Sequence, residues 1–209
     1  MNSPKDEIDK TIGEVVTNYY NNYEQFDSDI ERYSNAWNKY NDNFFEALSK
    51  YLNISWPKEH DIVYATVGII PVCPRYLDTF YFSVHVDINN EALVETCAHE
   101  LCHFLWFEKW RELYPESNKD DYEFPNTVWK YSEIVVEPIL NSKEISKVFD
   151  GKNTRYCYES FYDIYDGEEL FMTKLVNIYD EDISIEEKIS KGYEYVKSIR
   201  KNNRKKAPK

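Results

Sequence analysis

The alternation of apolar and polar residues along the chain predicts helices at both ends and a short sheet between them. Apolar side chains recur at helical spacing over residues 5–22 and 24–52. Two later segments, residues 61–72 and 79–88, are rich in Val, Ile, Tyr and Phe, which is typical of strands. The second alternates apolar and polar positions, as a strand with one wet face does. We therefore expect a short antiparallel hairpin or sheet flanked by helices.

A further helix is predicted over residues 93–110. At about 100° per residue, His103, Trp106 and Trp110 fall within about 40° of His99 around the helix axis. Most of the aliphatic residues of the segment fall on the opposite side. A surface helix has no reason to carry two His and two Trp away from its aliphatic side, so we expect this face to line a cleft.

The two histidines belong to the pentapeptide His99-Glu100-Leu101-Cys102-His103, which has the form H-E-x-x-H. Positions i and i+4 share one face of a helix, so the two imidazoles can hold one tetrahedral Zn²⁺. Glu100 then lies beside the metal, where it can take a proton from water. The competing interpretation is a chance match, but the chain has only 4 His. Cys102, inside the motif, is expected to be a packing residue rather than a reactive thiol.

A catalytic zinc usually has three protein ligands, so a third must be found. The metzincin pattern would need a Gly at the position of Trp106 and a His at that of Lys109, and is excluded. No His follows His103, so a third ligand further along the chain must be Asp, Glu or Cys. Glu112 and Glu123 are reserve candidates, although Glu112 should lie too far along the helix axis.

A second helix is predicted over residues 126–137, after Pro125. On it Glu133 and Glu137 are spaced i and i+4 with Trp129 on the same side, while the aliphatic residues face the other way. If the two helices pack antiparallel, both polar faces can meet at one metal. Pro138 should end or kink this helix, which leaves the direction of Glu137 open. A solvated acidic helix face is the alternative for both carboxylates.

H-E-x-x-H followed by a helix with E-x-x-x-E resembles the gluzincin branch of the zincin metallopeptidases, over roughly residues 80–140. The resemblance implies that His99 and His103 are metal ligands and Glu100 the general base. It also implies that Glu133 is the third ligand and that Glu137 orients a ligand His by accepting its other N–H. Asp is common where Glu137 stands. The implied fold is α+β: a small zincin-like domain whose sheet packs on the active-site helix. The strand before that helix would bind an extended substrate at its edge. His85 on this strand could face the cleft, although a surface position is the simpler expectation.

The C-terminal third is expected to be helical, and Ser184 and Glu187 form a capping box that opens its last helix. Peptide hydrolysis also needs a donor for the oxyanion, and gluzincins often use a downstream Tyr or His. No His is present there, so the candidates are four side chains of one segment, Arg155, Tyr156, Tyr158 and Tyr162. In a chain with 19 Tyr, none stands out. Tyr114, Tyr122 and Tyr131 lie nearer the motif in sequence.

The composition of the chain indicates which classes of binding partner and which location to expect. The net charge of −13 argues against nucleic acid as a partner, although the last residues, 197–209, are locally basic and are expected to fray. The N-terminus has no apolar stretch typical of a signal peptide and no segment reaches membrane-spanning length. The four Cys lack CxxC spacing, so we expect reduced thiols and a cytoplasmic protein without a membrane partner.

The chain is expected to form one compact unit with three regions: an N-terminal helical region (1–57), a zincin-like core (58–141) and a C-terminal helical region (142–209) with a basic tail. The leading hypothesis is a zinc metallopeptidase that acts on a peptide or protein substrate. One alternative is a zinc-binding protein that is non-catalytic or latent and acts through protein interaction. Another is a regulatory peptidase that cleaves a single partner.

Overall fold

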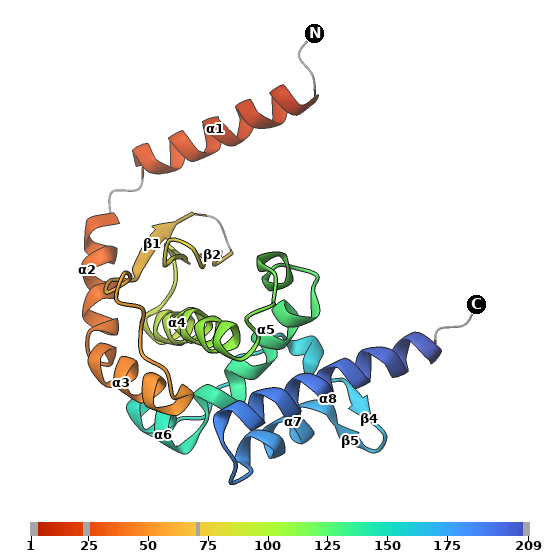
Figure 1. Cartoon of the computed structure of the whole chain (residues 1–209). Coiled ribbons are helices and arrows are strands. Elements are labelled where there is room, and N and C mark those ends of the chain that lie inside the picture. The colour runs from red at the N-terminus through yellow and green to blue at the C-terminus, as the bar shows by residue number, and fades with distance from the viewer. Residues whose placement is uncertain (1–3, 23–25, 70–71, 207–209) are drawn as a thin grey trace. The chain divides into compact units, whose positions relative to one another are not determined.

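The protein has a mixed α+β fold in which helices predominate, as Figure 1 shows. The strands of the described residues form a three-stranded and a two-stranded sheet. The computed structural model describes residues 4–22, 26–69 and 72–206. The α+β class expected from the sequence is confirmed. Within the described part of the chain, no helix has the length and apolar character required to cross a membrane.

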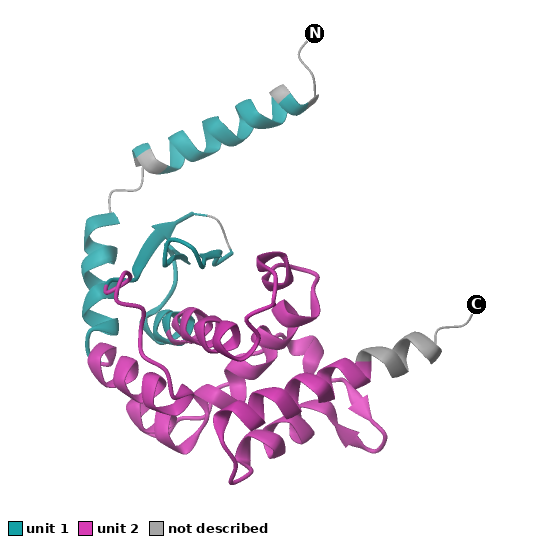
Figure 2. Ribbon diagram, in the orientation of Figure 1, with its two compact units in different colours: residues 1–39, 62–97 teal, residues 40–61, 98–209 magenta. Residues whose placement is uncertain are grey.

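Contacts divide the chain into two compact units (Figure 2). The first unit comprises residues 1–39 and 62–97, and the second comprises residues 40–61 and 98–209. The helix that carries the H-E-x-x-H motif, α4 (Asn90–Leu113), contributes to both. The predicted boundaries near residues 57 and 141 differ from these, because α1 and α2 belong to the first unit whereas α3 belongs to the second.

The first unit contains two helices and a three-stranded sheet: α1 (Pro4–Asn22), α2 (Phe26–Trp37), β1 (Tyr64–Gly68), β2 (Arg75–Tyr76) and β3 (Tyr81–His85). The helix expected over residues 24–52 is interrupted by a turn after Trp37, and its second part is α3 (Asn41–Leu52). Residues 24 and 25 lie outside the described chain.

The sheet has the order β1-β3-β2, with β1 parallel and β2 antiparallel to β3. The predicted antiparallel hairpin between the two long segments is therefore wrong. The connection between the two segments contains β2, which pairs with β3 on the side opposite β1. This intervening strand lets β1 and β3 run in the same direction. The predicted alternation on β3 is confirmed, because Phe82 and Val84 are buried while Tyr81, Ser83 and His85 are partly exposed.

β1 pairs with β3 along its whole length on one side, whereas β2 pairs only with Tyr81 and Phe82 on the other. The expectation that this strand binds an extended substrate at its edge stays a prediction. The segment after β3 is held by α2: the Tyr33 hydroxyl donates a hydrogen bond to the Val86 carbonyl, and Arg32 Nη1 donates to Asn90 Oδ1 at 2.6 Å. Asn89 caps α4, because its side-chain oxygen accepts a hydrogen bond from the Ala92 N–H at 2.9 Å.

Beyond Cys97, helix α4 is buried on nearly all sides. Trp106 and Trp110 stack at 5.2 Å between ring centroids, and Trp106 contacts the ring of Tyr131 edge-on at 5.6 Å. Tyr193 meets Trp110 at 4.8 Å. The expectation that both Trp side chains line a cleft is wrong, because these aromatic side chains from later helices cover them.

The second unit also contains the rest of the chain: α5 (Thr127–Leu140), α6 (Lys143–Ser146), α7 (Phe171–Asp180), α8 (Ile185–Lys206), the short 3₁₀ helices η1 (Lys119–Tyr122), η2 (Lys147–Phe149) and η3 (Glu159–Phe161), and the hairpin of β4 (Tyr165–Asp166) and β5 (Glu169–Leu170). The capping box at α8 is confirmed: Glu187 N–H donates to Ser184 Oγ at 3.2 Å, and Ser184 N–H donates to Glu187 Oε2 at 3.1 Å. The basic segment continues α8 as far as Lys206.

A buried lysine connects three helices of this unit. The Lys109 ammonium on α4 contacts Glu112 at 2.7 Å and Glu186 of α8 at 2.5 Å, and donates to the Asn53 carbonyl, at the end of α3, at 3.4 Å. The Lys109 side chain has no exposed surface, so its charge depends on these partners. The hydrogen bond from Lys109 lowers the pKa of Glu186 to about 2.

We expect Lys109→Met to lower the free energy of unfolding by about 2 kcal/mol, because both carboxylates lose their buried cation but remain partly hydrated. Glu186 has a depressed pKa in the folded protein, so its contribution is present above its ordinary pKa of 4.5 and is lost as the pH falls toward about 2. Urea unfolding of parent and variant across this range should show the difference narrowing at acid pH.

Lys191→Met is the matched control, since Lys191 pairs with Glu181 at an exposed position and should cost about 0.5 kcal/mol or less. A Lys109→Met effect no larger than that of the control, or one independent of pH, would contradict this account of Lys109.

Candidate metal centre

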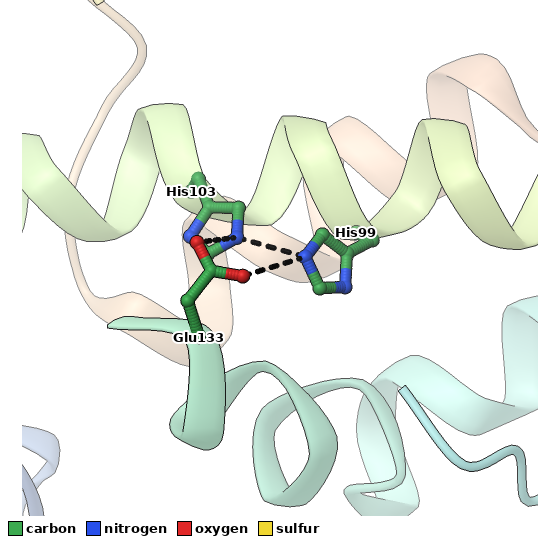
Figure 3. A group of neighbouring side chains, drawn as sticks. All are labelled: His99, His103 and Glu133. Atoms are coloured by element: carbon green, nitrogen blue, oxygen red, sulfur yellow. Dashed lines mark hydrogen bonds and ion pairs between the residues drawn. The ribbon is translucent and has the colours of Figure 1, made fainter. Parts of the chain in front are cut away.

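Three side chains of the second unit, from helices α4 and α5, lie close together (Figure 3). His99 and His103 come from successive turns of α4, and Glu133 comes from α5. Each offers one ligand atom, and these atoms all lie within 4.8 Å of one another. Among the described residues, this is the group of His, Cys, Asp or Glu side chains that could hold a metal ion.

The donor atoms have the spacing that a small divalent metal requires. The two Nε2 atoms are 2.9 Å apart, and Glu133 oxygens lie 3.5 Å from His99 Nε2 and 3.6 Å from His103 Nε2. Ligands about 2.05 Å from a tetrahedral zinc would be about 3.3 Å apart, which falls within this range. Two imidazole nitrogens and a carboxylate form a known three-ligand zinc set that leaves a fourth position for water or substrate. The residues present therefore fit zinc.

Burial separates the two histidines. The His103 side chain is fully buried, whereas 19% of the His99 side chain is exposed to solvent. Glu133 is 3% exposed, so the alternative of a solvated acidic face is wrong for this residue. Buried charge of this kind is costly without a counter-charge, and a cation bound between the three groups would supply one. His99 is thus the member of the group that solvent reaches.

Glu100 follows His99 on α4 and is 6% exposed. Its carboxylate is therefore held within the protein rather than on a hydrated helix face. This burial, next to a ligand candidate, agrees with the position expected for the residue that moves protons in an H-E-x-x-H site. Its assignment as general base stays a prediction.

The remaining carboxylates expected near the site have different surroundings. Glu112 pairs with Lys109, and Glu123 is exposed after η1. Neither belongs to the ligand group of Glu133. Glu137 is buried, and its Oε2 accepts hydrogen bonds from the Tyr156 N–H at 3.2 Å and from the Tyr162 hydroxyl. The predicted contact between Glu137 and a ligand histidine stays a prediction, as does the role of His85.

The candidate oxyanion donors differ in exposure. Tyr158 and Arg155 are exposed, and the Arg155 guanidinium lies over the Tyr162 ring at 4.5 Å. Tyr156 is partly buried. The Tyr162 hydroxyl is engaged with Glu137, and burial, with this hydrogen bond, raises its pKa so that it stays protonated. None of the four is assigned to the oxyanion by these contacts.

Three tyrosines nearer the motif have hydroxyl partners elsewhere. The hydroxyl of Tyr131 contacts Tyr179 and the Ile189 carbonyl, that of Tyr122 contacts Ser117, and that of Tyr114 contacts Ser190. These bonds indicate a structural role for each of the three.

Cys157 lies near the site and was not predicted from the sequence. It contacts the part of α5 beside Pro138. This proline lies inside the helix rather than ending it, and it has no N–H to donate to the Ile134 carbonyl four residues before. Cys157 Sγ lies 3.2 Å from that carbonyl oxygen and 3.3 Å from the carbonyl oxygen of Glu133. Burial raises the pKa of the Cys157 thiol, so it keeps its hydrogen for donation. The proline inside a helical segment was the signal that some outside donor would be needed.

Cys157 belongs to a segment that follows α5 closely, which we call the strap, residues 154–162. Its first residue pairs with the end of α5: Asn141 Nδ2 donates to the Thr154 carbonyl at 2.8 Å, and Thr154 N–H donates to Asn141 Oδ1 at 3.0 Å. With the bonds to Glu137 and Ile134, the strap contacts α5 from the turn of Glu133 to the last turn.

All four Cys are free thiols, as expected from their spacing.

Comparison of the chain with protein-family models, curated proteins and solved structures finds no match. The chemistry of the site therefore has to be argued from its own residues.

Proposed function

We propose that the protein is a zinc-dependent peptidase of the gluzincin-like kind, with a zincin-like arrangement of its motif helices. The observation that carries the proposal is the convergence of His99, His103 and Glu133 with donor spacings that suit one zinc ion. The order of the motif along the chain also agrees, with Glu100 following the first ligand.

When bound, Zn²⁺ polarises a carbonyl group and lowers the pKa of water to about 7. The chain's own residues would bind the ion and transfer the proton. His99, His103 and Glu133 would hold the ion. Glu100 accepts a proton from the attacking water and returns it to the amine that leaves when the C–N bond breaks. The same buried carboxylate thus serves as base and then as acid.

The substrate in this proposal is a peptide or protein. The chain's net charge of −13 favours a basic or neutral peptide over an acidic one, since like charges slow association. A dedicated peptidase with one protein target has the same site chemistry as a general one, so the experiment must sample many sequences.

The proposal is tested by incubating zinc-loaded protein with a peptide library of diverse sequence and identifying new termini by mass spectrometry. We expect cleavage that stops when zinc is removed with a chelator and resumes when zinc is restored. A protein that binds zinc at this site but cleaves no library member and no candidate protein would instead support a non-catalytic or latent zinc protein.

A further inference from the structure

We infer that Cys157 is a positioning residue for the metal centre: its thiol completes the hydrogen bonding of α5 beside Pro138 and thereby fixes the turn that carries Glu133. This inference rests on the proposed metal site. It assigns no chemistry to the thiol itself. The thiol acts through the backbone of a ligand-bearing helix.

The first step concerns the helix. In an α-helix each carbonyl accepts from the N–H four residues later, and a proline at that later position leaves the carbonyl without its intrahelical partner. Here Pro138 does so for Ile134, the residue directly after Glu133. Both Ile134 and Pro138 are buried, so water is a poor substitute. The Cys157 thiol lies 3.2 Å from this oxygen and supplies a hydrogen from outside the helix.

The second step connects the backbone to the ligand. Glu133 projects from the same turn, and its own carbonyl lies 3.3 Å from Cys157 Sγ. The thiol therefore lies against the carbonyl oxygens of two successive peptide groups, the one that joins Glu133 to Ile134 and the one that follows it. Contacts that hold a ligand side chain in place from outside the coordination sphere commonly contribute about 10–100-fold to metal affinity. We therefore expect the contacts of the thiol with this turn to affect metal binding through the position of Glu133.

The third step is why a thiol suits the position. Cys157 is anchored by its neighbours in the strap, since Tyr156 N–H donates to Glu137 Oε2 and Cys157 N–H donates to the Tyr162 hydroxyl oxygen at 3.4 Å. The side chain then has to reach from the strap to the Ile134 carbonyl and donate one hydrogen bond to it. A small side chain with a weak donor can do this without displacing the apolar neighbours of the helix.

The test measures zinc affinity by competition with a chromogenic chelator, at a temperature where every variant is folded. We expect Cys157→Ala to weaken zinc binding by about 10-fold, the lower end of the range for supporting contacts. Cys157→Ser, which keeps a donor, should retain most of the parent's affinity. Cys73→Ala, at a cysteine of the first unit, is the matched control and should bind zinc as the parent does.

The decisive variant combines Cys157→Ala with Pro138→Ala. Alanine at 138 restores the N–H that can bond to the Ile134 carbonyl, so the double variant should recover the affinity lost in Cys157→Ala. A simple packing role for the thiol would give no such recovery. If Cys157→Ala is too unstable to study, the comparison of Cys157→Ser with Cys157→Val gives the same distinction between a donor and an apolar side chain.

The outcomes separate the two proposals. A parent protein with no measurable affinity for zinc would refute the proposed function. A parent that binds zinc, with Cys157→Ala binding it equally well or with no recovery in the double variant, would refute the positioning role of Cys157 alone. The visible spectrum of the Co²⁺-substituted proteins provides a second readout, because a displaced Glu133 would change the coordination geometry.

Discussion

Replacement of Glu100 by Gln is expected to lower peptide hydrolysis by at least about 100-fold while leaving zinc content unchanged. General acid–base catalysis contributes about 10²–10⁴-fold, and the amide of Gln can neither accept nor return the proton. The substitution nearly preserves the size of a side chain that is 6% exposed, so the fold should survive. Initial rates on a cleaved peptide, together with metal analysis, give both quantities.

Glu108→Gln is a suitable control, because Glu108 lies on the same helix and is paired with Arg111 rather than placed in the ligand group. It should hydrolyse the peptide at nearly the parent rate. Hydrolysis by Glu100→Gln as fast as by the parent would show that another group moves the proton.

The second large effect is expected at Glu133. Glu133→Gln should weaken zinc binding by more than about 100-fold, above the about 10–100-fold range for residues that only support a ligand. Glu137→Gln should fall within that range or below it, because its Oε2 accepts from the strap and it does not belong to the ligand group. Both residues are buried carboxylates of one helix, so each variant controls for the other.

Chelator competition on the two variants decides between the carboxylates. A larger loss for Glu137→Gln than for Glu133→Gln would mean that the ligand assignment on α5 is wrong. Equal small losses would point to a third ligand outside this helix, with the exposed Glu123 the first to be examined.

The site could be predicted from sequence because its information is local. The i and i+4 spacing of His99 and His103 fixes one helix face, and Glu133 lies on a second helix whose limits were nearly correct. The three side chains meet if the His99 and His103 face of α4 packs against the Glu133 face of α5. Cys157 could not be predicted in the same way, because its partners are carbonyl oxygens of a helix distant in sequence.

The errors share a physical cause. Apolar periodicity shows which faces of an element are buried, but not which element covers them or which strand pairs with which. Alternation on β3 was correct, yet the partner across Tyr81 was a parallel strand on one side and β2 on the other. The Trp106 face was also correctly separated from the aliphatic residues, but it is covered by aromatic rings of other helices. The helix 24–52 was divided by a turn that no Gly or Pro marks.

The most direct test of the central claim is the zinc content of the purified protein and of His99→Ala, each measured by inductively coupled plasma mass spectrometry after zinc loading and removal of free metal. A single three-ligand site predicts about one zinc per parent chain and a large loss in the variant, because two donors cannot hold the ion as three do. His85→Ala, which changes a histidine of the first unit, should keep the parent's zinc. A parent chain without zinc, or a His99→Ala protein that retains all of it, would contradict the metal centre proposed here.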